Sequence, residues 1–203
     1  MAVITISRQF GAGGLPLGKM IAEKLNYRFL DDFLIDEIAK EAKVPRKEVI
    51  SMEKRLGIKA SKVASILFSS SYIDRKFAEN KAQIDEDAYF KIVRNMITKL
   101  AAEDNVVLIG RGSQYILAEK ENAYHFLLVA TKKDQIKIVR RIVKMTRADA
   151  EKIIKQGQRK RDHLYKKLRK TDFDEPNPYH MVLNMSRLSF ERARDQVCSV
   201  IEG

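Results

Sequence analysis

Short apolar segments alternate with amphipathic segments along most of this chain of 203 residues. The apolar segments cover residues 2–6, 27–30, 105–109, 125–130 and 181–183. Each one is short and ends at polar residues or glycine, which is typical of a buried β-strand. Between them, apolar residues recur at helical spacing, as in residues 17–25, 33–42 and 189–201. Parallel strands joined by helical crossovers give this order, so the pattern predicts an α/β fold with helices on both faces of the sheet.

Residues 44–103 interrupt the alternation. They show helical periodicity and no convincing strand, with Pro45 where a helix begins and Asp85 in position to cap a long helix. We therefore predict a core made of residues 1–43 and 104–203, with residues 44–103 as a helical insertion.

The composition is that of a water-soluble globular chain. Hydrophobic residues make up 45% of the sequence and charged residues 33%, which excludes a disordered chain. The longest apolar stretches, such as residues 126–130, are far shorter than the ~18 residues that cross a bilayer. The N-terminus has no basic region before its apolar run, and the single cysteine, Cys198, excludes an internal disulfide. We predict a cytoplasmic protein without a membrane partner.

The positive charge is concentrated in one segment. The whole chain has 39 Lys or Arg and 27 Asp or Glu, a net charge of +12, and residues 132–170 alone contain 16 basic and 4 acidic residues. Three interpretations stay open: a solvated helical face, a site for a small polyanion, or a nucleic-acid surface. Tyr165 is the only aromatic residue in this segment, so stacking on bases is disfavoured and nucleic acid is not expected as a partner.

A glycine-rich turn follows the first predicted strand and precedes a predicted helix. Gly11, Gly13 and Gly14 permit a close approach of the backbone to a ligand. Free amides and the positive end of a helix dipole make such a turn an anion site, most often for phosphate. The alternative is an ordinary tight turn between strand and helix.

Two alignments place this turn on the P-loop pattern of Gly, four residues, Gly, Lys, and Ser or Thr. The literal match ends at Gly18 and Lys19, and puts this lysine well inside the helix. In the second alignment the four defined positions are taken, in order, by Arg8, Gly13, Gly14 and Leu15. We favour the second because a phosphate loop begins where its strand ends. It leaves the chain without the usual lysine and without the hydroxyl that binds magnesium.

Three blocks of sequence resemble the cytidylate kinase-like family, a divergent branch of the nucleoside monophosphate kinases. They are Thr-Ile-Ser-Arg-Gln-Phe-Gly-Ala-Gly-Gly at residues 5–14, extended by residues 18–25; Val-Leu-Ile-Gly-Arg-Gly at residues 107–112, with residues 115–117; and the tail at residues 179–184 and 186–189. The resemblance implies a three-layer fold of the P-loop kinase type with a five-stranded parallel sheet. It also implies that residues 44–103 cover a nucleoside monophosphate and that residues 145–178 form a basic lid.

The function implied by this resemblance is ATP-dependent phosphoryl transfer to a nucleotide, with CMP or dCMP as the acceptor. ATP and Mg²⁺ are the implied cofactors, and the metal is expected to be held mainly through nucleotide phosphates. The chain departs from the family where cytidylate kinases have Asp-Gly-Arg-Asp, because residues 109–112 read Ile-Gly-Arg-Gly and two carboxylates are missing. The alternative function is therefore a nucleotide-binding regulatory protein with little or no turnover.

The predicted site residues fall into three groups. The phosphates of ATP are expected on Gly11, Ala12, Gly13, Gly14 and Leu15. Catalytic cations are expected from Arg8, Arg111, Arg159 and Arg161, because phosphoryl transfer needs converging positive charge. The acceptor nucleotide is expected on Asp31, Arg111, Arg161 and Asp162. Alternatives stay open for three of them: a structural role for Arg8, a surface charge on a turn for Arg111, and a helix cap for Asp31. No side chain is predicted to bind a metal, since the histidines and Cys198 lack ligand spacing.

Overall fold

The computed structural model describes residues 1–30, 32–56, 85–168, 170 and 172–203. Its strands are β1 (Val3–Arg8), β2 (Arg28–Leu30), β3 (Val106–Ile109), β4 (Ala123–Val129) and β5 (Met181–Asn184). Its helices are α1 (Gly14–Leu25), α2 (Asp32–Glu41), α3 (Arg46–Leu56), α5 (Glu86–Ala102), α6 (Ser113–Ile116), α7 (Lys132–Ile142), α8 (Arg147–Lys167) and α9 (Phe190–Glu202).

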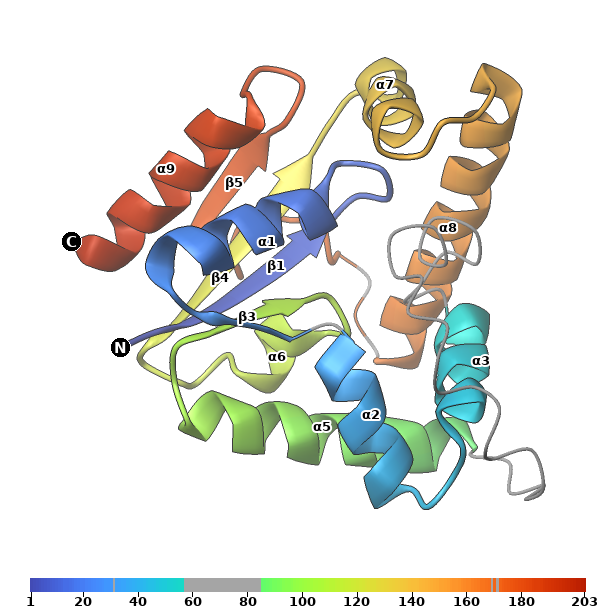
Figure 1. Cartoon of the computed structure of the whole chain (residues 1–203), viewed down its shortest axis with the longest axis vertical. Helices are drawn as coiled ribbons and strands as arrows, with labels where there is room; N and C mark the ends of the chain where they lie inside the picture. Colours follow the sequence, from blue (N-terminus) through green and yellow to red (C-terminus); the bar gives the residue numbers. More distant parts are fainter. Residues whose placement is uncertain (31, 57–84, 169, 171) are drawn as a thin grey trace.

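All five strands pair in parallel, in the order β2-β3-β1-β4-β5. The predicted parallel α/β fold is therefore confirmed. Because the strands are parallel, their carboxyl ends share one edge of the sheet, and Figure 1 shows that edge facing α7 and α8. Ligands of open parallel sheets bind at this edge.

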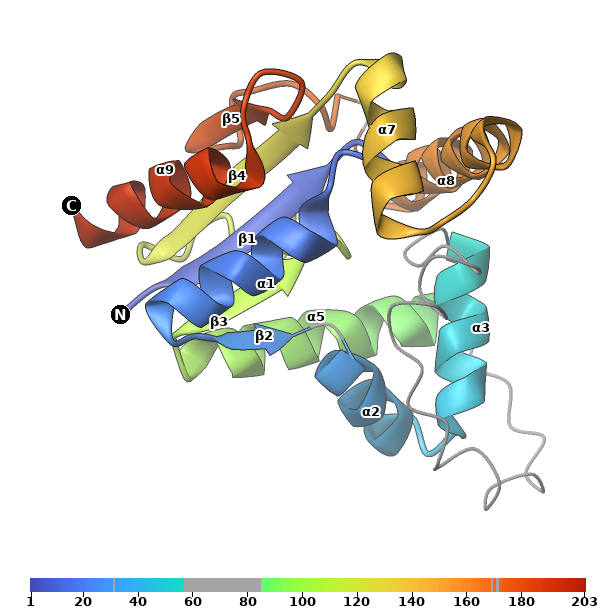
Figure 2. The same ribbon diagram turned by 45° about the horizontal axis from the view of Figure 1, so that its top comes forward.

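Helices cover both faces of the sheet, as the sequence predicts. Side chains alternate between faces along each strand, so Ile4 and Ile6 of β1 pack with α1 and α9, while Val3 packs with α5. Figure 2 shows α1 and α9 over one face and α5 beneath the other. The result is a three-layer structure with a separate apolar core on each side of the sheet.

In the segment predicted as a helical insertion, α3 begins directly after Pro45, and Asp85 caps α5 by accepting a 2.8 Å hydrogen bond from the amide of Ala88. Residues 57–84 of this segment lie outside the described residues. Val106 and Leu108 of β3 lie in one apolar cluster with buried side chains of α2, α3 and α5. Helix α5 therefore packs on the sheet itself. The division of the chain into core and insertion stays a prediction.

Most of the basic segment is a solvated surface. Among the described Lys and Arg side chains of residues 132–170, only Arg161 is buried. The others are exposed on α7 and α8, or, for Lys144 and Lys170, in the segments after these helices. Thr131 and Thr146 cap α7 and α8 by accepting from the amides of Asp134 and Asp149. The interpretation as a solvated helical face thus describes every basic residue of α7 and α8 except Arg161.

The strand and helix boundaries differ from the predicted ones by at most three residues, and several coincide. β1 runs on to Arg8 because Ser7 and Arg8 continue to pair with Leu127 and Leu128 of β4. The short helix α6 has no counterpart among the predicted elements. No helix among the described residues is both long and apolar enough to cross a bilayer.

Candidate functional site

The turn between β1 and α1 is built around two glycines with left-handed backbones. Gly11 has φ +90° and Gly13, the N-cap of α1, has φ +87°, values that side chains with a Cβ rarely adopt. A Cβ at Gly13 would also lie 2.6 Å from the ring of Phe190. The strand ends at Arg8 and the helix starts at Gly14, so the turn occupies the position that the second P-loop alignment gives it.

Four backbone N–H groups of this turn donate no hydrogen bond to another described residue, those of Gly11, Gly13, Gly14 and Leu15. The first turn of α1 contains no acidic residue that would neutralise its positive end. Unpaired amides at a helix N-terminus make an anion site. Ala12 differs from the other predicted contacts, because its amide donates to the carbonyl of Gln9 at 3.1 Å.

The literal P-loop alignment does not fit the structure. Lys19 lies in the second turn of α1 and is exposed. Gly18 is a packing residue, since a Cβ there would lie 2.6 Å from Cδ1 of Ile109 and 2.9 Å from the ring of Phe29.

Arg8 extends from the end of β1 between two glycines. A Cβ at Gly14 would lie 3.0 Å from Cγ and from Cδ of Arg8, and a Cβ at Gly110 would overlap its Nη1 atom. Position 14 is where the P-loop pattern has its lysine. The side chain of Arg8 therefore passes the position from which the lysine side chain would extend, and brings a guanidinium to the same edge of the sheet.

The turn after β3 holds Arg111 in the interior. Gly110, Arg111 and Gly112 all have positive φ angles, of 68°, 55° and 71°. The Arg111 side chain is 2% exposed and forms two hydrogen bonds to Glu53 of α3, Nε to Oε1 at 2.7 Å and Nη2 to Oε2 at 3.1 Å. The interpretation of Arg111 as a surface charge on a turn is wrong, because the turn points its side chain inward against the carboxylate.

Tyr89 of α5 completes this buried group by donating from its hydroxyl to Oε1 of Glu53 at 3.0 Å. Burial and the neighbouring Glu53 carboxylate raise the pKa of the Tyr89 phenol well above its usual value. The tyrosine thus stays a donor, and the group joins α3 and α5 to the turn after β3.

Arg161 of α8 is the second buried arginine at this edge, and it is 5% exposed. Its Nη2 donates to Oδ1 of Asp174 at 2.6 Å and lies 3.4 Å from Oγ of Ser7. Its guanidinium lies 4.6 Å from the ring centre of Phe173 and 5.0 Å from that of Tyr165. Its Nη1 atom is buried and has no hydrogen-bond partner among the described residues.

Three predicted site residues remain: Arg159, Asp162 and Asp31. Arg159 is exposed on α8, and Asp162 accepts a 3.0 Å hydrogen bond from Gln158 one turn earlier on the same helix. Asp31 lies outside the described residues. The structure therefore brings together Arg8, the glycine turn and Arg161 at one edge, but not Arg159.

A network of neutral polar groups next to Arg161 was missed in the sequence. Gln114 of α6 donates to the hydroxyls of Tyr165 and Tyr179 at 3.0 and 3.2 Å, and the Tyr165 hydroxyl lies 3.1 Å from that of Ser7. The network joins β1, α6, α8 and the segment before β5. The only local signal for it was the helical spacing of Arg161 and Tyr165.

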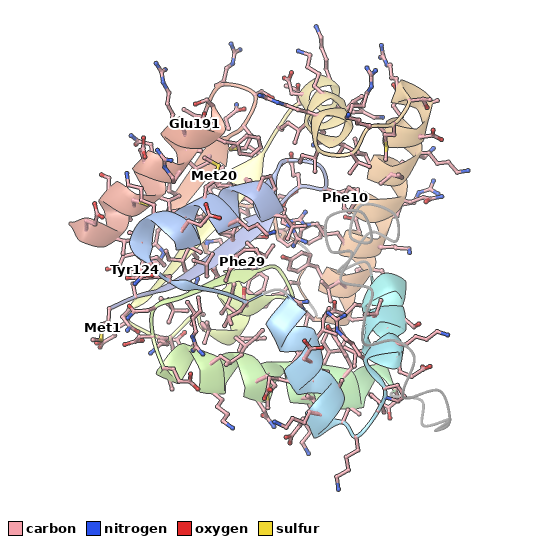
Figure 3. All side chains as sticks on the ribbon, viewed as in Figure 1. Met1, Phe10, Met20, Phe29, Tyr124 and Glu191 are labelled. Carbon is pink, nitrogen blue, oxygen red and sulfur yellow. The ribbon has the colours of Figure 1, made fainter. Side chains whose placement is uncertain are left out.

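The glycine turn is attached to α8 through Phe10. A Cβ at Gly157 of α8 would overlap the ring of Phe10, and the amide of Phe10 donates to Oε1 of Gln158 at 3.2 Å. Figure 3 shows Phe10 between the turn and α8. A cleft of about 510 Å³ opens nearby, lined by Gln158, Asp172, Phe173, Asp174 and Glu175.

The family follows from a comparison of the whole sequence with family models. The model described as the cytidylate kinase-like family matches residues 3–187. The chain belongs to this family. No curated protein matches the sequence significantly.

Solved structures similar to this cytidylate kinase-like chain share its fold at low sequence identity. An uncharacterized protein from Eubacterium ventriosum has a TM-score of 0.69 at 19% identity, with 99% of this chain and 98% of that chain covered. Shikimate kinase from Bacteroides thetaiotaomicron has a TM-score of 0.53 at 16% identity over 100% and 99% of the two chains. A gluconokinase from Sinorhizobium meliloti has a TM-score of 0.53 at 11% identity over 99% and 94%. The fold is therefore of the P-loop kinase type.

Proposed function

We propose that this chain is a nucleoside monophosphate kinase that transfers the γ-phosphoryl group of ATP to CMP or dCMP. The observation that carries the proposal is the path of Arg8, which lies along Gly14 and reaches Gly110 beside the unpaired amides of the glycine turn. A cation and a set of amides at the carboxyl edge of a P-loop kinase fold suit a nucleotide's phosphates. Membership in the cytidylate kinase-like family supports a nucleotide acceptor.

The donor phosphates would bind to the amides of Gly11, Gly13, Gly14 and Leu15. Phosphoryl transfer depends mainly on positioning and on neutralising charge that spreads over the phosphate oxygens. Arg8 supplies the positive charge that a P-loop lysine supplies elsewhere, and its planar guanidinium can contact two oxygens at once.

The acceptor phosphate would bind to Arg161. This side chain is buried, lies within 3.4 Å of Ser7 at the end of β1, and has an Nη1 donor with no partner among the described residues. An unpaired buried donor is costly, and a phosphate oxygen would satisfy it.

Magnesium would enter this site as part of the ATP complex. The described residues contain no group of three or more His, Cys, Asp or Glu side chains that could hold a metal ion, and Leu15 stands where the P-loop has a hydroxyl. Magnesium in nucleotide sites keeps several waters and binds substrate phosphates, so the residues present fit a metal that the nucleotide brings with it.

The test is a transfer assay with purified protein, ATP, Mg²⁺ and a panel of nucleoside monophosphates, with products separated by chromatography. We expect ADP and a nucleoside diphosphate in equal amounts, with CMP or dCMP giving the highest kcat/KM. Arg8→Ala is expected to lower kcat/KM by about 100-fold or more, the usual effect of losing one contact to transition-state charge.

Lys19→Ala is the matched control, because it removes the cation of the literal P-loop alignment from an exposed position. It is expected to leave kcat/KM within about twofold. Saturable ATP binding without a diphosphate product from any acceptor would overturn the proposal in favour of a regulatory nucleotide-binding protein. A large loss in Lys19→Ala with none in Arg8→Ala would overturn the role of Arg8.

A further inference from the structure

The face that α8 turns toward the sheet carries a charged group and an aromatic ring one helical turn apart. Arg161 and Tyr165 are 5% and 2% exposed, although the helix around them is strongly basic. Side chains four residues apart lie on the same face of a helix. Together they present a guanidinium and a flat ring to whatever lies against them.

Two consecutive residues of the segment before β5 occupy this platform. The ring of Phe173 stacks on that of Tyr165 with centres 4.4 Å apart and an angle of 11° between the planes. The carboxylate of Asp174 pairs with Nη2 of Arg161 at 2.6 Å. A planar ring and an anion thus contact the same arginine, which is the combination that a nucleoside monophosphate would offer.

The carboxylate satisfies the platform only in part. Oδ1 of Asp174 accepts from Nη2 of Arg161. Oδ2 of Asp174 accepts a long hydrogen bond, of 3.5 Å, from Nε2 of Gln9. The Nη1 atom of Arg161 stays buried without a partner among the described residues. A phosphate has more acceptor oxygens than a carboxylate and would satisfy both nitrogens.

The occupying segment is open to solvent on its other side. The Asp174 side chain is 34% exposed, and the next three residues of the chain are exposed as well. The segment lines the 510 Å³ cleft beside Gln158, and cavities of this size hold small ligands. Its anchor is the hydroxyl of Tyr179, which donates to the carbonyl of Phe173 at 2.8 Å. Because this bond holds the backbone of Phe173, the Phe173 ring and the Asp174 carboxylate can turn away from the platform while the chain stays attached to Tyr179.

We propose that Phe173 and Asp174 act as a built-in substitute for the acceptor nucleotide, with the ring in place of the base and the carboxylate in place of the phosphate. A nucleoside monophosphate must displace them to bind Arg161 and Tyr165, so the segment lowers the affinity of the unliganded protein for its acceptor. The inference rests on the proposed function for the identity of that acceptor.

Isothermal titration calorimetry with three probes tests the proposal: CMP, cytidine and inorganic phosphate. Asp174→Asn is expected to bind CMP and phosphate about tenfold more tightly than the unaltered chain, because a carboxylate no longer competes with phosphate for the Arg161 guanidinium. Cytidine binding is expected to be unchanged in this variant. Phe173→Ala is expected to bind CMP and cytidine more tightly and to leave phosphate binding unchanged.

Two further variants assign the effect to this site. Glu121→Gln removes an exposed carboxylate near the opposite edge of the sheet, just before β4, and is expected to change no Kd. Adding Arg161→Met to Asp174→Asn is expected to abolish the gain for CMP and phosphate, which excludes phosphate bound at the glycine turn as its source. Unchanged or weaker binding in both single variants, or no binding of any probe, would overturn the proposal.

Phosphoryl transfer is measured separately in the same proteins, so the two proposals fail independently. The predicted pattern of Kd values without any transfer would overturn the kinase function and leave the substitute intact. Phosphoryl transfer without this pattern of Kd values would support the kinase function and overturn the proposal that Phe173 and Asp174 act as a substitute for the acceptor.

Discussion

The guanidinium of Arg8 fills the space that a side chain at Gly110 would need. The two residues lie 102 positions apart in the sequence, at the carboxyl ends of the paired strands β1 and β3. Gly110 hydrogen-bonds through its amide to the carbonyl of Ile6 at 3.1 Å, which holds the turn against β1. Gly110, the first glycine of the Ile-Gly-Arg-Gly sequence, thus helps to position Arg8.

Gly110→Ala is therefore expected to displace Arg8. Its Cβ would overlap Nη1, and its φ of +68° adds strain of roughly 1–2 kcal/mol. We expect kcat/KM for phosphoryl transfer to fall about as far as in Arg8→Ala. Gly112→Ala is the control, since its φ of +71° carries similar strain while its Cβ would meet Leu168 and not Arg8. Equal losses of activity in the two variants would show that strain alone is responsible.

Moving the positive charge to position 14 tests whether Arg8 replaces the lysine of the P-loop. The Cβ of a lysine at position 14 would lie only 3.0 Å from Cγ and from Cδ of Arg8. Gly14→Lys alone is expected to crowd Arg8 and to lower kcat/KM. Combined with Arg8→Ala, the lysine gains this space, and we expect at least tenfold more activity than in Arg8→Ala. A double variant no better than Arg8→Ala would mean that the two positions do not serve the same phosphates.

The fold was predictable because its central strands β3, β1 and β4 are buried on both faces over most of their length. Such strands consist mainly of apolar residues, as in residues 106–109, and the helices between them dictate parallel pairing. The end of β1 was placed too early because Ser7 and Arg8 are polar and yet continue the ladder with β4. Helix α6, with four residues, is too short to show helical periodicity.

The buried arginines differ in how far the sequence could reveal them. Arg161 falls on the apolar face of α8, whose buried positions follow helical spacing at residues 150, 154, 157, 161, 164 and 165. This spacing distinguishes it from Arg159 and was available in the sequence. Glu53 also falls at helical spacing, four residues after the buried Val49 of α3, but its partner Arg111 lies 58 positions away and could not be identified from that spacing. Asp174 likewise follows no local pattern, since it contacts Arg161 and the distant Gln9.

The ion pair between Arg111 and Glu53 is expected to be essential for stability. Removing one partner of a buried pair leaves an uncompensated charge and typically costs 3–5 kcal/mol, so Glu53→Gln should lower the free energy of unfolding in urea by about this amount. Glu103→Gln is the matched control: Glu103 pairs with Arg28 at the same distance of 2.7 Å, but both side chains are about half exposed. We expect a loss below about 1 kcal/mol there. Similar losses in both variants would contradict the importance of burial.

Stability is also expected to depend on pH through His125 of β4. Burial and the neighbouring His180 lower the pKa of this 4% exposed imidazole from 6.5 to about 4. Its Nδ1 lies 2.7 Å from Oγ1 of Thr5, and a hydrogen bond to the backbone of Leu117 opposes the shift only in part. The folded chain thus keeps the ring neutral at a pH where the unfolded chain protonates it.

Because the unfolded state then binds more protons, the free energy of unfolding falls as the pH falls from about 6.5 to 4 and levels off below, as far as His125 is concerned. The shift corresponds to a loss of at most ~3 kcal/mol. His125→Asn keeps an acceptor for Thr5 but cannot titrate, so its stability relative to that of the unaltered chain should rise by up to ~3 kcal/mol between pH 8 and pH 4. Urea unfolding of both chains across this pH range measures the difference between their free energies of unfolding. Both chains contain the same carboxylates, so the contribution of the carboxylates cancels in this difference. The exposed His163 provides the control, because His163→Gln should keep the full pH dependence. Parallel curves for His125→Asn and the unaltered chain would mean that the buried ring is not the group that titrates.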